Sequence, residues 1–255
     1  MSYPKIAAQM YTVRDFCKTS EGIRESLRKI KEAGYDAVQV SGIGPIEHRQ
    51  MKDYADEYEL EICATHISFD RLKNDTQDVI AQHKLWNCKY VGIGSMPGNY
   101  ANSKEGFAEF AVEASKYAKI LADNGLKFIY HNHSFEFQKF GKVTGMEILL
   151  QESDPEVFGF ELDTYWVQHG GADPVDWIYK VSGRMDVIHF KDMVATNEWK
   201  PAMAEVGEGN LNWKGIIEAC KKTGVIWAAV EQDICRHDPF ESLAISRRNL
   251  KNMGL

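Results

Sequence analysis

Cysteine is scarce in this sequence and never occurs in a spacing that binds metal or forms a redox pair. The five cysteines are scattered, odd in number and nowhere arranged as CxxC. Such usage is typical of reduced thiols in a cytosolic protein. We therefore expect a cytoplasmic protein without a disulfide framework, and we look for metal ligands among other residue types.

Long apolar runs and clustered basic residues are also missing. No window approaches the roughly 20 apolar residues of a membrane span, and the N-terminus has no apolar stretch behind a basic region, so we expect neither a membrane span nor a secretory signal. The net charge of -7 comes from well-mixed charges and leaves no basic stripe for a phosphate backbone, which disfavours nucleic-acid binding. No low-complexity tract or polar linker divides the chain, so residues 1–255 are expected to form one domain.

Eight short apolar or β-branched runs recur along the chain, and stretches with helical periodicity separate most of them. The runs cover residues 6–12, 37–42, 61–67, 90–94, 127–133, 158–164, 186–192 and 227–233. This alternation predicts a parallel sheet. Eight units favour a closed (β/α)8 TIM barrel over the alternative, an open flavodoxin-like sheet.

Helix start and stop signals support the same alternation. A capping residue opens several of the helical stretches, and a glycine closes them. These stretches run from Ser20 to Gly34, from Asn102 or Ser103 to Gly125, and from Asn212 to Gly224.

The predicted strands end in an unusual number of polar residues. In barrel enzymes the site lies at the C-terminal mouth, where these ends meet. The candidates are His66 after strand three, His131, His133 and Glu136 after strand five, Asp163 after strand six, His189 and Lys191 after strand seven, and Glu231 after strand eight. Glu208, in the glycine-rich turn 206–210, is a weaker candidate.

A mixed set of carboxylates and imidazoles is typical of a site for one divalent ion such as Mn²⁺, Co²⁺ or Zn²⁺, with Mg²⁺ a further possibility. A single acidic residue near a strand end is usually a helix cap. However, apolar residues precede Asp163, His189 and Glu231, so each starts from a buried strand, where an unpaired charge is costly. Metal binding is therefore the favoured interpretation. Lys191 lies two residues after His189, so its side chain should share the inward face of the strand.

Such an ion can chelate neighbouring hydroxyl and carbonyl oxygens of a sugar and stabilise an enediolate formed when the adjacent proton leaves. Proton removal needs a general base, with a second acid or base on the other face if the centre is inverted. Glu231 and one of Glu136, His131 or His133 are the natural pair.

Several motifs follow one another along the chain: AAQMYTVRD (7–15), YHNHSFEF (130–137), LDT (162–164), HFKD (189–192), VGEGNLNW (206–213), VEQD (230–233) and DPFESLAISRRNLKNMG (238–254). Together they resemble the sugar phosphate isomerase/epimerase family of xylose isomerase-like TIM barrels. Each motif alone is weak, but the ordered set is specific and spans nearly the whole chain.

The resemblance implies one divalent ion bound by Glu, Asp, His and Glu from strands five to eight. Carried across by motif, the last three are Asp163, His189 and Glu231. Strand five instead ends in His-Asn-His, so either Glu136 reaches back to the ion, or a histidine replaces the glutamate as ligand or base. We expect Glu136 to be the ligand and a histidine the acid/base or substrate contact, which puts the two-glutamate epimerisation mechanism in question.

Three functions follow from these observations. The first is a metal-dependent isomerase or epimerase of carbohydrate metabolism acting on a monosaccharide or keto-sugar, in which His66, His131, His133 and Lys191 position or protonate the substrate. The second is a metal-dependent lyase that dehydrates an inosose or cleaves a 3-keto-glycoside. The third is a non-catalytic sugar-binding or partner subunit. The expected partner is a small sugar, and a homo-oligomer is possible. Cleavage of DNA is disfavoured because the net charge is negative and because related barrels that cleave DNA use several metals and many more histidines than the eight present here.

Overall fold

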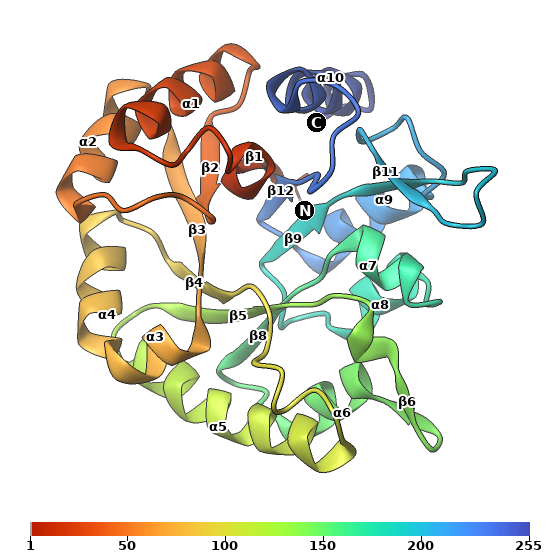
Figure 1. Cartoon of the computed structure of the whole chain (residues 1–255). Helices are drawn as coiled ribbons and strands as arrows, with labels where there is room; N and C mark the ends of the chain where they lie inside the picture. The colour runs from red at the N-terminus through yellow and green to blue at the C-terminus, as the bar shows by residue number, and fades with distance from the viewer. Residues whose placement is uncertain (1) are drawn as a thin grey trace.

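The computed structural model describes residues 2–255 and shows a ring of parallel strands surrounded by helices (Figure 1). The strands of the ring are β1 (Lys5–Gln9), β2 (Ala37–Val40), β3 (Glu61–Ile67), β4 (Tyr90–Ile93), β5 (Lys127–His131), β8 (Phe158–Glu161), β9 (Val187–Phe190) and β12 (Trp227–Val230). Each lies in or overlaps one predicted run. The predicted (β/α)8 TIM barrel is therefore confirmed, and the open-sheet alternative is wrong because a bridge between Asp163 and His189 joins the two ends of the eight-stranded sheet.

The barrel closes between β8 and β9. These two strands share no extended ladder, and the ring order runs β8-β5-β4-β3-β2-β1-β12-β9. A parallel bridge between Asp163 and His189 joins the two ends, with the His189 amide donating to the Leu162 carbonyl at 2.8 Å. The closing contact therefore lies at the mouth of the barrel.

Ten α-helices and two 3₁₀ turns connect the strands in the described part of the chain. They are η1 (Met10–Val13), α1 (Ser20–Glu32), α2 (His48–Glu57), α3 (Phe69–Asn74), α4 (Thr76–Leu85), α5 (Lys104–Asp123), η2 (Phe135–Phe137), α6 (Gly145–Glu152), α7 (Thr164–His169), α8 (Pro174–Lys180), α9 (Trp213–Thr223) and α10 (Pro239–Asn252). Two hairpins complete the fold: β6 (Lys139–Phe140) with β7 (Val143–Thr144), and β10 (Asp192–Val194) with β11 (Ala202–Ala204). No helix within residues 2–255 is long and apolar enough to cross a membrane.

The helix caps largely follow the sequence signals. Ser103 and Asn212 cap α5 and α9 as predicted, and Gly224 ends α9 in the left-handed conformation. The predicted Ser20 cap is wrong by one residue, because the Thr19 side chain accepts the Gly22 amide and Ser20 is already helical.

Successive side chains of each strand point alternately into the barrel and toward the helices, which divides the core into two parts. One cluster fills the interior of the barrel and includes Tyr90, Ile129, Val187 and Trp227. A larger cluster packs between the strands and the helices. Because side chains two residues apart share a face of a strand, the inward positions beyond the interior cluster become polar toward the mouth.

Asp192 organises the loop beside the mouth. Its fully buried carboxylate accepts hydrogen bonds from the backbone amides of Gly207, Gly209 and Leu211 and from the Trp213 indole at 2.6 Å. A Cβ atom on Gly209 would lie 2.4 Å from an Asp192 oxygen, so glycine is required there. This one carboxylate therefore holds the whole 207–213 segment against β10.

We expect Asp192→Asn to lower the free energy of unfolding by about 3 kcal/mol, because an amide NH2 would face backbone donors and leave buried groups unpaired. Denaturant unfolding measures the change, and Asp123→Asn on the exposed end of α5 is the control, expected to stay within about 0.5 kcal/mol. A loss for Asp192→Asn no larger than that of the control would contradict this account of the loop.

Candidate metal centre

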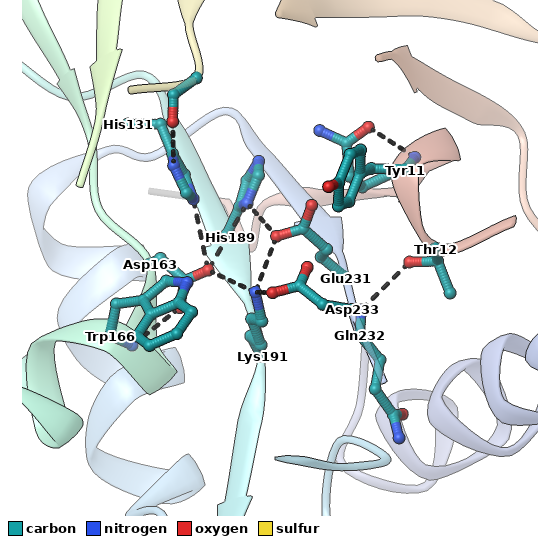
Figure 2. Close-up of polar contacts among 12 residues, drawn as sticks. Tyr11, Thr12, His131, Asp163, Trp166, His189, Lys191, Glu231, Gln232 and Asp233 are labelled. Atoms are coloured by element: carbon teal, nitrogen blue, oxygen red, sulfur yellow. Dashed lines mark hydrogen bonds and ion pairs between the residues drawn. The ribbon is translucent and has the colours of Figure 1, made fainter. Parts of the chain in front are cut away.

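Four strand ends each direct two polar side chains, spaced two residues apart, into the mouth. The pairs are His131 and His133 at the end of β5, Glu161 and Asp163 at the end of β8, His189 and Lys191 at the end of β9, and Glu231 and Asp233 just after β12. Figure 2 shows these strand ends converging near the bridge that closes the barrel, with side chains His131, Asp163, His189, Lys191, Glu231 and Asp233. The barrel thus gathers residues that lie far apart in the sequence, from His131 to Asp233.

Within residues 2–255, two groups of side chains have the spacing of a metal site: His66 with Glu161 and His189, and a larger group of four residues that is buried throughout. The members of the larger group each offer a ligand atom, and these atoms all lie within 4.8 Å of one another. This larger group consists of His131, Asp163, His189 and Glu231. The structure therefore brings together the three ligands predicted from strands six to eight, and His131 takes the place beside them at the end of strand five.

The hydrogen bonds of His131 determine which of its nitrogens faces the group. Its Nδ1 lies 3.0 Å from the carbonyl oxygen of Gly94, which can only accept, so Nδ1 carries the proton. In the neutral ring Nε2 then has a lone pair, and it points at Oδ2 of Asp163 from 3.3 Å. A lone pair and a carboxylate repel each other unless a cation lies between them.

The same reasoning applies to His189. Its Nε2 lies 2.8 Å from Oε1 of Gln39, whose amide nitrogen donates to Glu161, so the amide oxygen accepts the Nε2 proton. Nδ1 of the neutral ring then faces Glu231 at 3.2 Å and Asp163 at 3.7 Å. Burial alone would lower the pKa of His189, but Glu161 and Glu231 hold it well above its usual value, so a proton satisfies this contact in the protein alone.

Two imidazole nitrogens directed at two buried carboxylates form a donor set that fits a divalent cation. Nitrogen and carboxylate ligands in equal number suit a borderline ion such as Zn²⁺, Co²⁺ or Mn²⁺. The side chains present thus fit a divalent ion of this class.

Lys191 supplies a fixed positive charge at the edge of the group, as Figure 2 shows. Its Nζ lies 2.7 Å from Asp233, 3.1 Å from Glu231 and 3.5 Å from Asp163. Burial would lower the pKa of Lys191, but Glu231 and the two aspartates raise it above its usual value, so the side chain remains an ammonium. Burial would also raise the pKa of Glu231, yet Lys191 and His189 hold it well below its usual range.

The other predicted site residues take different positions. His66 lies beside the group, with its ring stacked on His189 at 5.3 Å, and His133 lies 5.0 Å from the His131 ring. Burial lowers the pKa of His133 to about 3, so its ring is neutral. Glu208 is exposed and its carboxylate accepts from Asn249, because the loop turns its amides rather than this side chain toward Asp192.

Glu136 is buried but does not join the ligand group within residues 2–255. It lies on η2, whose turn directs the carboxylate toward Tyr130 rather than toward the ion-binding atoms. The Tyr130 hydroxyl donates to it at 2.7 Å and the His133 amide at 2.9 Å, and burial raises the pKa of Glu136 to about 7. Here the structure departs from the expected ligand set and favours the histidine alternative.

Two functional positions were missing from the sequence prediction. Glu161 and Gln39 are fully buried beneath the ligand group and bind each other across the barrel. Residues two apart in a strand share a face, which places Lys191 beside His189. Glu161 lies two residues before Asp163, so the same rule identifies it. Gln39 has no comparable signal, because an amide is neither charged nor one of the residue types from which the site was predicted.

Comparison with known proteins places the chain in a family. The profile described as "Xylose isomerase-like TIM barrel" matches residues 27–251. The chain belongs to this xylose isomerase-like TIM barrel family. The resemblance predicted from the motifs is thus confirmed.

Relatives of this xylose isomerase-like barrel include proteins named inosose dehydratase. One from Lacticaseibacillus casei is 23% identical, and the match covers 85% of each chain. Another, from Mesomycoplasma hyopneumoniae, is 24% identical over 66% of this chain but only 62% of its own length. Among solved structures, a sugar phosphate isomerase/epimerase from Parabacteroides distasonis superposes with a TM-score of 0.82 at 20% identity, covering 98% of this chain and 94% of the other.

Substitution at the two strand-five positions tests which of them is the ligand in this xylose isomerase-like barrel. We expect His131→Gln to weaken zinc binding by about 100-fold, and Glu136→Gln to change it by less than about threefold. Calorimetric titration of the metal-free proteins measures both. The reverse order of effects would assign the ligand to Glu136.

Proposed function

We propose that the chain is a metal-dependent enzyme that removes a proton next to the carbonyl of a sugar or cyclic polyol. The ion would be bound by the four-residue group described above: His131, Asp163, His189 and Glu231. The observation that supports this is the pair of imidazole nitrogens directed at carboxylates, because the two rings need a cation where they meet. A bound divalent ion would polarise the substrate carbonyl and offset the charge that develops on its oxygen.

Glu231 is the proposed base. Its carboxylate remains ionised at neutral pH, and it lies at the end of β12 where a substrate entering the mouth would meet it. The Lys191 ammonium, 3.1 Å from Glu231, is suited to bind a substrate oxygen and to stabilise negative charge as the proton leaves. Asp233 holds the other side of Lys191 and so fixes its direction.

Substrate contacts are proposed for polar atoms beside the group that have no partner among residues 2–255. Nδ1 of His133 and the indole nitrogen of Trp166 are buried and unpaired, and the two rings lie 5.4 Å apart. Nε2 of Gln9, next to Gln39 in the barrel register, is also unpaired. Because buried donors without partners are costly, hydroxyl groups of a polyol are fitting ligands for this side of the mouth.

The favoured outcome is loss of a hydroxyl group after proton removal, as in a dehydratase. Inversion of a centre by two bases needs a second base on the opposite face of the substrate. At strand five the group contains an imidazole fixed by Gly94, while Glu136 is bound to Tyr130, so a second carboxylate is not offered there. The relatives named inosose dehydratase point to the same reaction class.

Isomerisation or epimerisation is the second candidate. His133 favours it, because a neutral ring with an unpaired nitrogen beside His131 could act as the second acid or base. The two outcomes share the first proton transfer. In dehydration a hydroxyl group is then lost, whereas in isomerisation or epimerisation a proton returns to carbon.

The test is incubation of the manganese-loaded protein in D2O with inososes, ketoses and 3-keto-glucosides, followed by mass spectrometry. We expect deuterium exchange next to the carbonyl and a product lighter by one water from an inosose. Chelation of the metal should abolish both, and Glu231→Gln should slow them about a thousandfold.

A product that has lost no water and has one hydrogen replaced by deuterium would instead support isomerisation or epimerisation. Absence of exchange across the panel, despite stoichiometric bound metal, would contradict the proposed enzyme and favour a sugar-binding subunit.

A further inference from the structure

A single carboxylate beneath the candidate metal centre receives contacts from three strands. Glu161 is fully buried, and its Oε2 lies 2.5 Å from Nε2 of His66 on β3. Its Oε1 accepts from the Gln39 amide on β2 at 2.9 Å and lies 3.3 Å from Nε2 of His189 on β9. Both oxygens therefore face donors, although Glu161 is not a member of the ligand group.

The contact with His66 is direct. An ionised carboxylate can only accept, so Nε2 of His66 carries the proton and Nδ1 of the neutral ring does not. Glycines on the neighbouring strand make room for this ring. A Cβ atom at Gly92 would lie 2.8 Å from the ring and one at Gly94 would lie 3.1 Å from Nδ1. The ring is thus held by Glu161 on one edge and seated on glycine backbone at another.

The contact with His189 runs through Gln39 as well as directly. Because Glu161 accepts, the Gln39 side chain must point its NH2 group toward Glu161 and its oxygen toward His189. That oxygen in turn requires a proton on Nε2 of His189. The charge of Glu161 therefore decides the orientation of one amide and, through it, the protonated nitrogen of a second ring.

We propose that Glu161 is a positioning residue that sets the tautomers of two histidines, holding the proton on Nε2 of His66 directly and on Nε2 of His189 through Gln39. Nδ1 of His189 is then left free toward Asp163 and Glu231. For His189 the inference rests on the proposed metal centre. For His66 it needs no metal, because the contact with Glu161 involves the protein alone.

Glu161→Gln makes a sharp test, because a glutamine offers one acceptor and one donor where the glutamate offers two acceptors. If the new NH2 group faces His66, the proton of that ring must move to Nδ1. If it faces Gln39, that amide must turn over and His189 must be protonated on Nδ1. In either case one of the two tautomers changes.

The measurement is long-range nitrogen–proton NMR on zinc-loaded protein labelled with ¹⁵N-histidine. We expect both rings of the unaltered protein to be protonated on Nε2, and one of them to change in Glu161→Gln. The zinc dissociation constant should rise about 10- to 100-fold if His189 is the ring that changes, and stay within about threefold if it is His66. Glu205→Gln is the matched control: Glu205 is also buried and accepts from the Ser242 hydroxyl, and its substitution should alter neither tautomer.

The unaltered protein is decisive even if Glu161→Gln fails to fold. Protonation of either ring on Nδ1 alone would overturn the proposal, as would a folded Glu161→Gln with both tautomers unchanged. Failure of the unaltered protein to bind zinc would contradict the proposed function instead. In that case the spectrum of His66 in the metal-free protein still tests the role of Glu161.

Discussion

The backbone pairing of Asp163 with His189 closes the barrel, and the same two residues supply side chains to the candidate metal centre. The strands β8 and β9 depend on this bridge because they lack an extended ladder. Closure of the fold and assembly of the centre are therefore one event.

Charge balance is the second constraint at the mouth. Glu161, Asp163 and Glu231 are buried carboxylates, and isolated buried charges are strongly destabilising. Lys191 compensates part of this charge, and protonation of His189 compensates more in the protein alone. In the protein alone, these positive charges offset the buried carboxylates. A divalent ion bound by the same carboxylates would offset their charge in the same way.

The sequence predicts the strands and most of the centre, because strand-end polarity follows from local alternation. Asp163, His189, Lys191 and Glu231 are found in this way. The ligand at strand five cannot be predicted in this way, because the short turn η2, and not alternation along a strand, directs the Glu136 side chain. Gln39 is also beyond sequence reasoning, since its partners lie across the barrel at separations of more than a hundred residues.

The order of the strands has a consequence for synthesis of the protein. Strand β12, which Glu231 follows directly, pairs with β1. The ring is therefore incomplete until the last of its strands has been synthesised. Domains otherwise tend to fold as they emerge from the ribosome. Here the candidate ligand group cannot assemble until β12 has been made, so a nascent chain that ends before this strand would lack Glu231 and with it one side of the group.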